Sequence, residues 1–366
     1  MNRIDVAATL IAGGGFVCVL APVLGQMETV DTLGSSLNNL RVIHGGMMCY
    51  SRDWNGRQFT AVPDDFGAYE GNCFEYIHQT GCYPPLYLGW SCGPTLLYQF
   101  GVGCSALGSS VTCGGNLSTT IPINFNSARY AYGSFRLANA RPLHEYLGGR
   151  FYDPVFYASA DTEVYAAASE FFPLDCEFAS TELIPTSYAL SPAAMYHPDV
   201  MRAPSRGGFQ SPESLPHGYV SPAVDQALHP NLKTWMIENN WLRTSPARCH
   251  PAFEDPWLAL TSVCSGYLFN HGLDAAPASL FYDGSTDTLR TADAVADDAR
   301  ILMQSGGVDG LWSRDTPFGA TGYYGEHSFD GVLASHHMFT TDGIRGRDRL
   351  RNARPSAAAL SPGDTR

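Results

Sequence analysis

Residues 6–24 read VAATLIAGGGFVCVLAPVL and contain no charged side chain. At a rise of about 1.5 Å per residue, a helix of this length spans roughly 28 Å, close to the thickness of a bilayer core. Arg3 precedes the stretch, and Glu28 and Asp31 follow it, so the positive-inside rule keeps the N-terminus cytoplasmic and exports the remainder. The stretch therefore predicts a single membrane span.

Two other interpretations of this stretch remain open. A cleaved secretory signal needs a small-x-small cleavage site, and the segment around Ala21 and Gly25 supplies one poorly, since Pro22 lies within it. A buried helix of a soluble protein needs a solvated face, and Thr9 is the one polar side chain available for it.

The pattern that follows predicts that the helix continues. Apolar side chains recur at steps of three and four residues, which is typical of one buried stripe on a helix. They are Val30, Leu33, Leu37, Leu40, Ile43, Met47, Tyr50 and Trp54. Asn55-Gly56 is a stop signal. We expect one helix over residues 1–56, roughly 75 Å long and kinked near Pro22, with the membrane span in its first half.

These residues resemble type IV pilins and type II secretion pseudopilins. Mature members of the family carry an acidic residue at the fifth position and a proline late in the apolar span, and Asp5 and Pro22 stand at the matching places. Asp5 stands where Glu is usual. The helix ending at Asn55-Gly56-Arg57 resembles that of prepilin-type proteins of planctomycete-like bacteria.

A second match to this subfamily lies far downstream. The subfamily carries a signature of His, about nine residues and Asp-Gly, and here His271 is followed after eleven residues by Asp283-Gly284. Before it, the segment from Pro230 through Lys233 resembles the subfamily's strand that begins Pro-Ser-Lys. The resemblance covers residues 1–57 and 229–291.

The resemblance implies an α+β, pilin-like fold, with a long N-terminal membrane-spanning helix packed on an antiparallel sheet that carries large loop insertions. It also implies a structural, non-enzymatic subunit of a secretion or pilus-like filament, in the bacterial inner membrane with its globular domain outside the cytoplasm. The implied partners are the lipid bilayer and other pilin-like subunits. In pilins the acid that corresponds to Asp5 meets the terminal amine of a neighbouring subunit; alternatively, Asp5 lies among the headgroups.

A second hypothesis is a single-pass, membrane-anchored binding or hydrolytic protein of the cell envelope, which has the pilin-type helix but forms no filaments. No Gly-x-Ser-x-Gly elbow or phosphate-binding loop marks the chain as an enzyme. The formal net charge of −13 argues against a nucleic-acid partner, because an acidic surface repels phosphates.

The ten cysteines include no Cys-x-x-Cys pair, which disfavours a zinc ribbon. Five of them recur every nine to twelve residues between Cys73 and Cys113 and predict disulfides in an oxidising compartment, with buried free thiols as the alternative. Lys233 is the chain's one lysine.

The remaining sequence predicts an exported, β-rich domain over residues 57–349 and a disordered tail over 350–366. Residues 57–150 are expected to form strands and stapled loops. Further strands are expected at 233–238 and 323–343, with a hairpin that turns at Asp283-Gly284. A helix is expected after Thr291, ending at Gly306-Gly307.

Metal binding is weakly indicated. His336 and His337, on a strand, would point to opposite faces, so they are expected to be structural rather than ligands of one ion. No cofactor is predicted other than calcium, for which aspartates in glycine-containing turns are candidates. These candidates are Asp283, Asp287, Asp330 and Asp342.

Overall fold

A computed structural model describes the chain from Thr32 onward, with gaps. The described residues are 32–62, 69, 73–80, 84, 86–93, 97–100, 120–125, 133–179, 183–239, 272–327 and 332–351. All of them belong to one compact unit, Thr32–Arg366.

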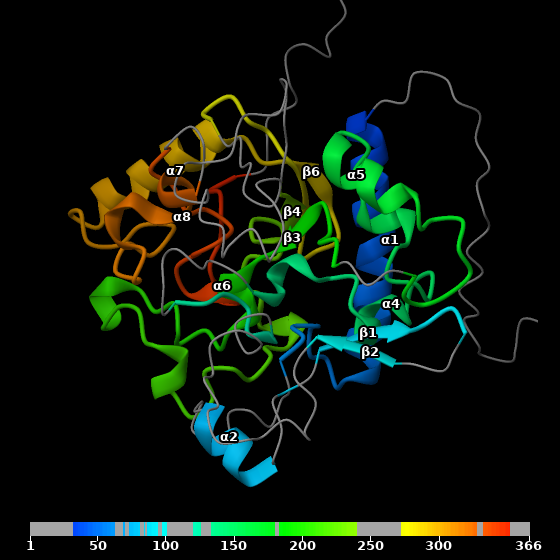
Figure 1. Cartoon of the computed structure of the whole chain (residues 1–366). Helices are drawn as coiled ribbons and strands as arrows, with labels where there is room; N and C mark the ends of the chain where they lie inside the picture. Colours follow the sequence, from blue (N-terminus) through cyan, green and yellow to red (C-terminus); the bar gives the residue numbers. More distant parts are fainter. Residues whose placement is uncertain are drawn as a thin grey trace, which may run out of the picture. The chain divides into compact units, whose positions relative to one another are not determined.

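The first described element is helix α1, Thr32–Asp53, drawn in blue in Figure 1. Its buried side chains include Leu40, Ile43 and Met47, at the spacing that the apolar stripe predicts. The helix ends where the sequence indicates, because Asn55 and Gly56 both take positive φ, 54° and 81°. Asparagine and glycine tolerate this left-handed conformation better than other residues do.

The predicted fold class requires a correction. The α+β class and the antiparallel sheet are confirmed, but the long membrane-spanning helix is not found among the described residues. Among the described helices none is both long enough and apolar enough to cross a membrane. The reason lies in α1 itself, whose 22 residues expose Asn38, Arg41 and Arg52 and form an amphipathic surface helix. The predicted span, residues 6–24, lies outside the described residues.

A four-stranded antiparallel sheet forms the centre of the described unit, in the order β3-β4-β5-β6. Its strands are Tyr188–Leu190, Thr234–Glu238, Ala278–Phe281 and Thr286–Thr288. Every residue of β3, β4 and β5 is buried, whereas β6 is partly exposed, so the first three strands form the core of the sheet. The strand predicted at 233–238 and the hairpin that turns at Asp283-Gly284 are both confirmed.

Helix α1 packs against β5 and β6, and the aromatic rings of this contact connect the helix to the sheet. His44 on α1 meets Trp235 on β4 edge to face at 5.8 Å between ring centroids. Trp235 in turn stacks on Tyr282, with centroids 4.7 Å apart and planes 7° from parallel. Such aromatic contacts add stability beyond the apolar area that they bury.

A second, two-stranded sheet pairs β1, Leu86–Trp90, with β2, Leu97–Phe100. A disulfide joins Cys92, just after β1, to Cys176. The prediction of strands and stapled loops for residues 57–150 is therefore confirmed in part. It missed the helix α2, Cys73–Thr80, because eight residues are too few for helical periodicity to be recognised.

The other described helices surround the sheets (Figure 1). The α-helices are α4 Arg141–His144, α5 Thr162–Ser169, α6 Pro192–Met195, α7 Thr291–Gln304 and α8 Gly322–His327. The 3₁₀ turns are η4 Ser134–Arg136, η5 Pro154–Phe156, η6 Pro204–Arg206, η7 Pro212–Ser214, η8 Val224–Gln226, η12 Gly319–Thr321 and η13 Gly343–Arg345.

Two predictions for the C-terminal part had different outcomes. The helix expected after Thr291 is α7, and Gly306 and Gly307 follow it with positive φ, as expected. The strands expected over residues 323–343 are not found in its described parts, 323–327 and 332–343. This segment starts with α8 and continues in turns, with one isolated bridge from Trp312 to Thr340.

Candidate functional site

Two groups of polar side chains in the described unit could carry chemistry, one buried and one at the surface. The first surrounds Lys233, whose side chain is fully buried. Its Nζ donates to Ser191 Oγ at 2.8 Å, to Thr340 Oγ1 at 2.9 Å and to Asp348 Oδ2 at 2.8 Å. An ammonium group has three donors, so all three are satisfied.

Asp348 is equally buried and collects donors from three segments of the chain. Besides Lys233, its Oδ2 accepts from the backbone N of Thr234 at 3.0 Å, and its Oδ1 accepts from the backbone N of His337 at 2.8 Å. Burial alone would raise the pKa of Asp348, but the charge of Lys233 and these hydrogen bonds outweigh it and hold that pKa well below its usual range. Burial lowers the pKa of Lys233, and the Asp348 carboxylate opposes that shift. The short contact and the matched donors and acceptors describe an ion pair.

Two adjacent histidines complete this group. His337 places Nε2 3.1 Å from the carbonyl of Ala189, which can only accept, so Nε2 carries the proton of the neutral ring. Burial lowers the pKa of His337 to about 3 and that of His336 to about 4. Neither ring nitrogen of His336 has a hydrogen-bond partner among the described residues, and its ring packs beside Tyr324.

We name Ser191, Lys233, His336, His337 and Asp348 the buried lysine cluster. The contact between Ser191 and Lys233 has the composition of a serine–lysine catalytic dyad. However, a general base must be able to lose its proton, whereas Asp348 stabilises the ammonium form of Lys233. Both side chains of the pair are also closed off from solvent. The arrangement therefore joins β4 to the C-terminal segment.

Another buried acid, Glu238, lies between α1 and the sheet. Glu238, at the end of β4, accepts a hydrogen bond from the backbone N of Ala278 at 2.8 Å, while its Oε1 has no partner among the described residues. Burial raises the pKa of Glu238 to about 8, and Ser36 of α1 and Ala278 oppose that shift. At neutral pH this carboxyl group is protonated.

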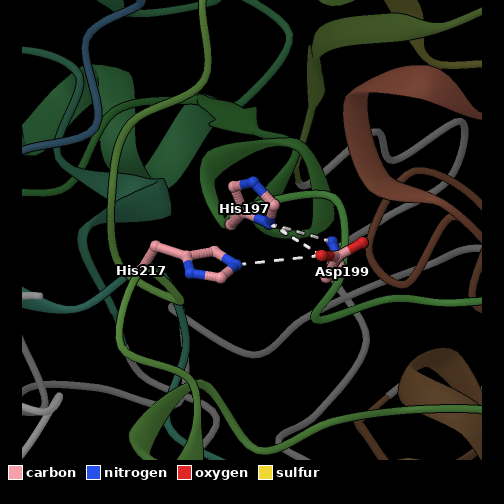
Figure 2. A group of neighbouring side chains, drawn as sticks. All are labelled: His197, Asp199 and His217. Carbon is pink, nitrogen blue, oxygen red and sulfur yellow. Dashed lines mark hydrogen bonds and ion pairs between the residues drawn. The ribbon is translucent and has the colours of Figure 1, made fainter.

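The second group lies at the surface and consists of His197, Asp199 and His217, which we name the surface histidine cluster (Figure 2). Asp199 Oδ2 lies 3.7 Å from His197 Nδ1 and 3.7 Å from His217 Nε2. The two imidazole rings meet edge to face, with centroids 4.2 Å apart. Burial and the neighbouring His217 lower the pKa of His197, so its ring is neutral at pH 7.

The Asp283-Gly284 signature forms the turn of the hairpin between β5 and β6. Gly284 has φ +82°, and a Cβ there would lie 2.6 Å from His44 Cε1 of α1. Asp283 accepts from the backbone N of Ser285 at 2.9 Å and so fixes the turn. The turn therefore packs directly against α1, and only glycine fits at its tip.

The calcium candidates are not neighbours in one group within the described residues. Asp283 caps the hairpin turn, Asp287 pairs with Arg349 at 3.1 Å, and Asp342 pairs with Arg206. Asp330 lies outside the described residues, as do Asp5, Pro22 and His271. Calcium binding stays a prediction.

Lys233 and the structural histidines His336 and His337 stand out in the sequence, but their meeting with Ser191 and Asp348 was not predicted, and neither was the surface histidine cluster. The buried lysine cluster had one available signal, a single lysine in a strand of apolar residues. The surface histidine cluster had almost none, because His197, Asp199 and His217 follow no known ligand spacing. A comparison of the chain with protein families, with curated proteins and with solved structures finds no match.

Proposed function

We propose that this chain is a structural subunit of a secretion or pilus-like filament and acts through contacts with other subunits rather than as an enzyme. The observation that carries the proposal is the packing of α1 on the antiparallel sheet. Three segments far apart in the sequence meet there: the apolar stripe of α1, the strand that follows Lys233, and the turn at Gly284. These segments lie within the two ranges that resemble pilins, 1–57 and 229–291.

The way in which the buried polar groups are hydrogen-bonded supports a structural role. In the buried lysine cluster each charge of the Lys233–Asp348 pair is matched by another group, and the pair joins β4 to the end of the described chain. Glu238 is held neutral at the contact between α1 and the sheet. Such groups contribute to the specificity of the fold instead of facing a substrate.

The disulfide between Cys92 and Cys176 supports a location outside the cytoplasm, since disulfides persist in oxidising compartments. The proposed partners are other subunits of the same kind. Met48, near the C-terminal end of α1, and Trp54, the residue that follows the helix, are 42% and 49% exposed, so this end of the helix offers apolar side chains to a second copy.

The test places a photo-crosslinking amino acid at Met48 of the full-length chain in the source cells. The matched control places it at Met303 on α7, which is 81% exposed but lies on another helix. We expect a ladder of crosslinked multimers from position 48 and little from position 303. Monomer at both positions, or equal ladders, contradicts assembly through α1. Monomer at both positions favours the envelope protein that forms no filaments.

A further inference from the structure

The surface histidine cluster is supported by a rigid backbone. The loop that follows α6 and the loop before Tyr219 are joined by a hydrogen bond from His197 N to Gly218 O at 3.0 Å. Each histidine lies within two residues of a tyrosine that is buried in the core, Tyr196 or Tyr219, and these two rings lie 5.8 Å apart. The two loops are thus fixed beside each other, and their polar side chains converge above the core.

We propose that His197, Asp199 and His217 bind a divalent transition-metal ion, for which Zn²⁺ is the best match. One donor atom from each residue lies within 4.8 Å of the other two. Donors of a tetrahedral zinc ion lie about 3.3 Å apart, given metal–ligand distances of about 2.0–2.1 Å. The distances of 3.7 Å from Asp199 Oδ2 to each imidazole therefore need to shorten by a few tenths of an ångström. The two imidazole donors, which lie within 4.8 Å of each other, also have to move closer, by rotation of the partly exposed side chains.

The chemistry of the donors selects the class of ion. Two imidazoles and one carboxylate suit zinc and its transition-metal neighbours, whereas calcium and magnesium prefer oxygen ligands alone. The side chains are 26%, 39% and 47% exposed for His197, Asp199 and His217, so an ion reaches them without unfolding the loops. Three protein ligands leave at least one coordination position for water or another ligand.

The ordinary alternative, an ion pair or hydrogen bond among these side chains, accounts for the geometry less well. At 3.7 Å the carboxylate oxygen is beyond hydrogen-bond range of either imidazole nitrogen. The His197 ring accepts a long hydrogen bond from the backbone N of Asp199, at 3.3 Å to Nδ1. The three donor atoms converge without satisfying one another, which is the arrangement that a bound cation completes.

Two arginines oppose the binding of a cation. Arg202 lies 3.7 Å from Asp199 Oδ2 and competes for the same oxygen, and the charge of Arg345 also acts on His197. A bound ion must outcompete Arg202, so Arg202→Gln should increase the affinity. If these side chains only form ion pairs with one another, Arg202→Gln should not increase the affinity for zinc.

The experiment titrates the metal-free, full-length chain with Zn²⁺ in competition with a chromophoric chelator. We expect His217→Ala and Asp199→Asn to remove one equivalent of bound zinc, or to weaken it at least tenfold, and Arg202→Gln to tighten it. The matched control is His78→Ala on α2, an exposed histidine outside the cluster, which should bind zinc like the wild type. Co²⁺ should give d–d absorption bands in the wild type that His217→Ala lacks.

Equal zinc stoichiometry and affinity in the wild type, His217→Ala and His78→Ala would overturn the proposal, because any bound zinc would then lie elsewhere. Folding is checked in each variant by circular dichroism before titration. His217 is about half exposed, and Asp199→Asn keeps the side-chain volume, so two independent variants test the same site. The result does not depend on whether the chain forms filaments.

Discussion

The buried lysine cluster and the surface histidine cluster contain similar residue types but differ in what surrounds them. Lys233 and Asp348 are fully buried, and hydrogen bonds within 3 Å satisfy their charges. Asp199 and His217 are partly exposed, and their nearest polar atoms stay 3.7 Å apart. The Lys233–Asp348 pair is satisfied by protein groups alone, whereas the donor atoms of the surface histidine cluster do not satisfy one another.

The difference shows how burial decides the role of a polar group. A buried charge costs several kcal/mol unless its partners are in place, so such a group holds its neighbours in one arrangement. A half-exposed group pays little of this cost and keeps lone pairs that a ligand can use. Substitutions in the two groups should therefore have very different effects on stability.

The largest effect is expected from Lys233→Met. This change removes the cation and leaves Asp348 as an uncompensated buried anion, which should cost about 3–5 kcal/mol of unfolding free energy. Guanidinium denaturation with disulfides intact measures it. The double variant Lys233→Met/Asp348→Asn removes the anion as well and should recover part of the loss. A single variant as stable as the wild type would contradict the role of the pair.

Glu238→Gln should stabilise the protein at alkaline pH. The folded pKa of about 8 lies above the ordinary value of 4.5, so the folded state binds this proton more tightly than the unfolded state. The carboxyl group therefore costs stability progressively as the pH rises from 4.5 to 8. At pH 8 we expect the unfolding free energy of the variant to exceed that of the wild type by up to about 4 kcal/mol.

The control for this prediction is the same pair of proteins at pH 5, where the difference between Glu238→Gln and the wild type should be small. Denaturant midpoints at both pH values give the two free energies. A gain that is independent of pH would show that packing against Ser36, rather than titration of Glu238, separates the two proteins.

His336→Phe should reduce the sensitivity to acid. The folded pKa of His336, about 4, lies below the ordinary value of 6.5, so its stabilising effect is present above pH 6.5 and is lost as the pH falls toward 4. When the pH falls from 7 to 5, the unfolding free energy of the variant should decrease by about 2 kcal/mol less than that of the wild type. Any constant packing cost cancels in this difference. Identical slopes would mean that the pKa of His336 is the same in the folded and the unfolded state.

The smallest effect is expected in the surface histidine cluster. Without metal, His217→Ala and Asp199→Asn should each change the unfolding free energy by no more than about 0.5 kcal/mol. Thermal unfolding in the presence of a chelator measures this. A loss comparable to that of Lys233→Met would mean that the cluster has a structural role like that of the buried group.

The sequence predicted elements that depend on local pattern. The apolar stripe gave the course of α1 and its end at Asn55, and alternation with a turn gave β4 and the hairpin at Gly284, because periodicity depends on near neighbours. Its extension of α1 into a membrane-spanning helix was wrong: the described helix begins at Thr32 and exposes a polar face.

The candidate sites could not be predicted because they depend on contacts between distant residues. Lys233 meets Asp348 across 115 positions of sequence, and no local pattern reports such a pairing. His197 and His217 come together because two loops without periodic structure are held by one backbone hydrogen bond to Gly218. Histidines in such loops look like ordinary turn residues.

The burial of Lys233 has a practical consequence for anyone who handles this protein. It is the chain's one side-chain amine, and its exposed fraction is 0% in the described unit. Amine-reactive dyes and crosslinkers should therefore not react with Lys233 in the folded molecule. They should acylate it only when the C-terminal segment separates from β4. The rate at which acylated Lys233 appears in mass spectra would thus report how often this domain opens, without any engineered probe.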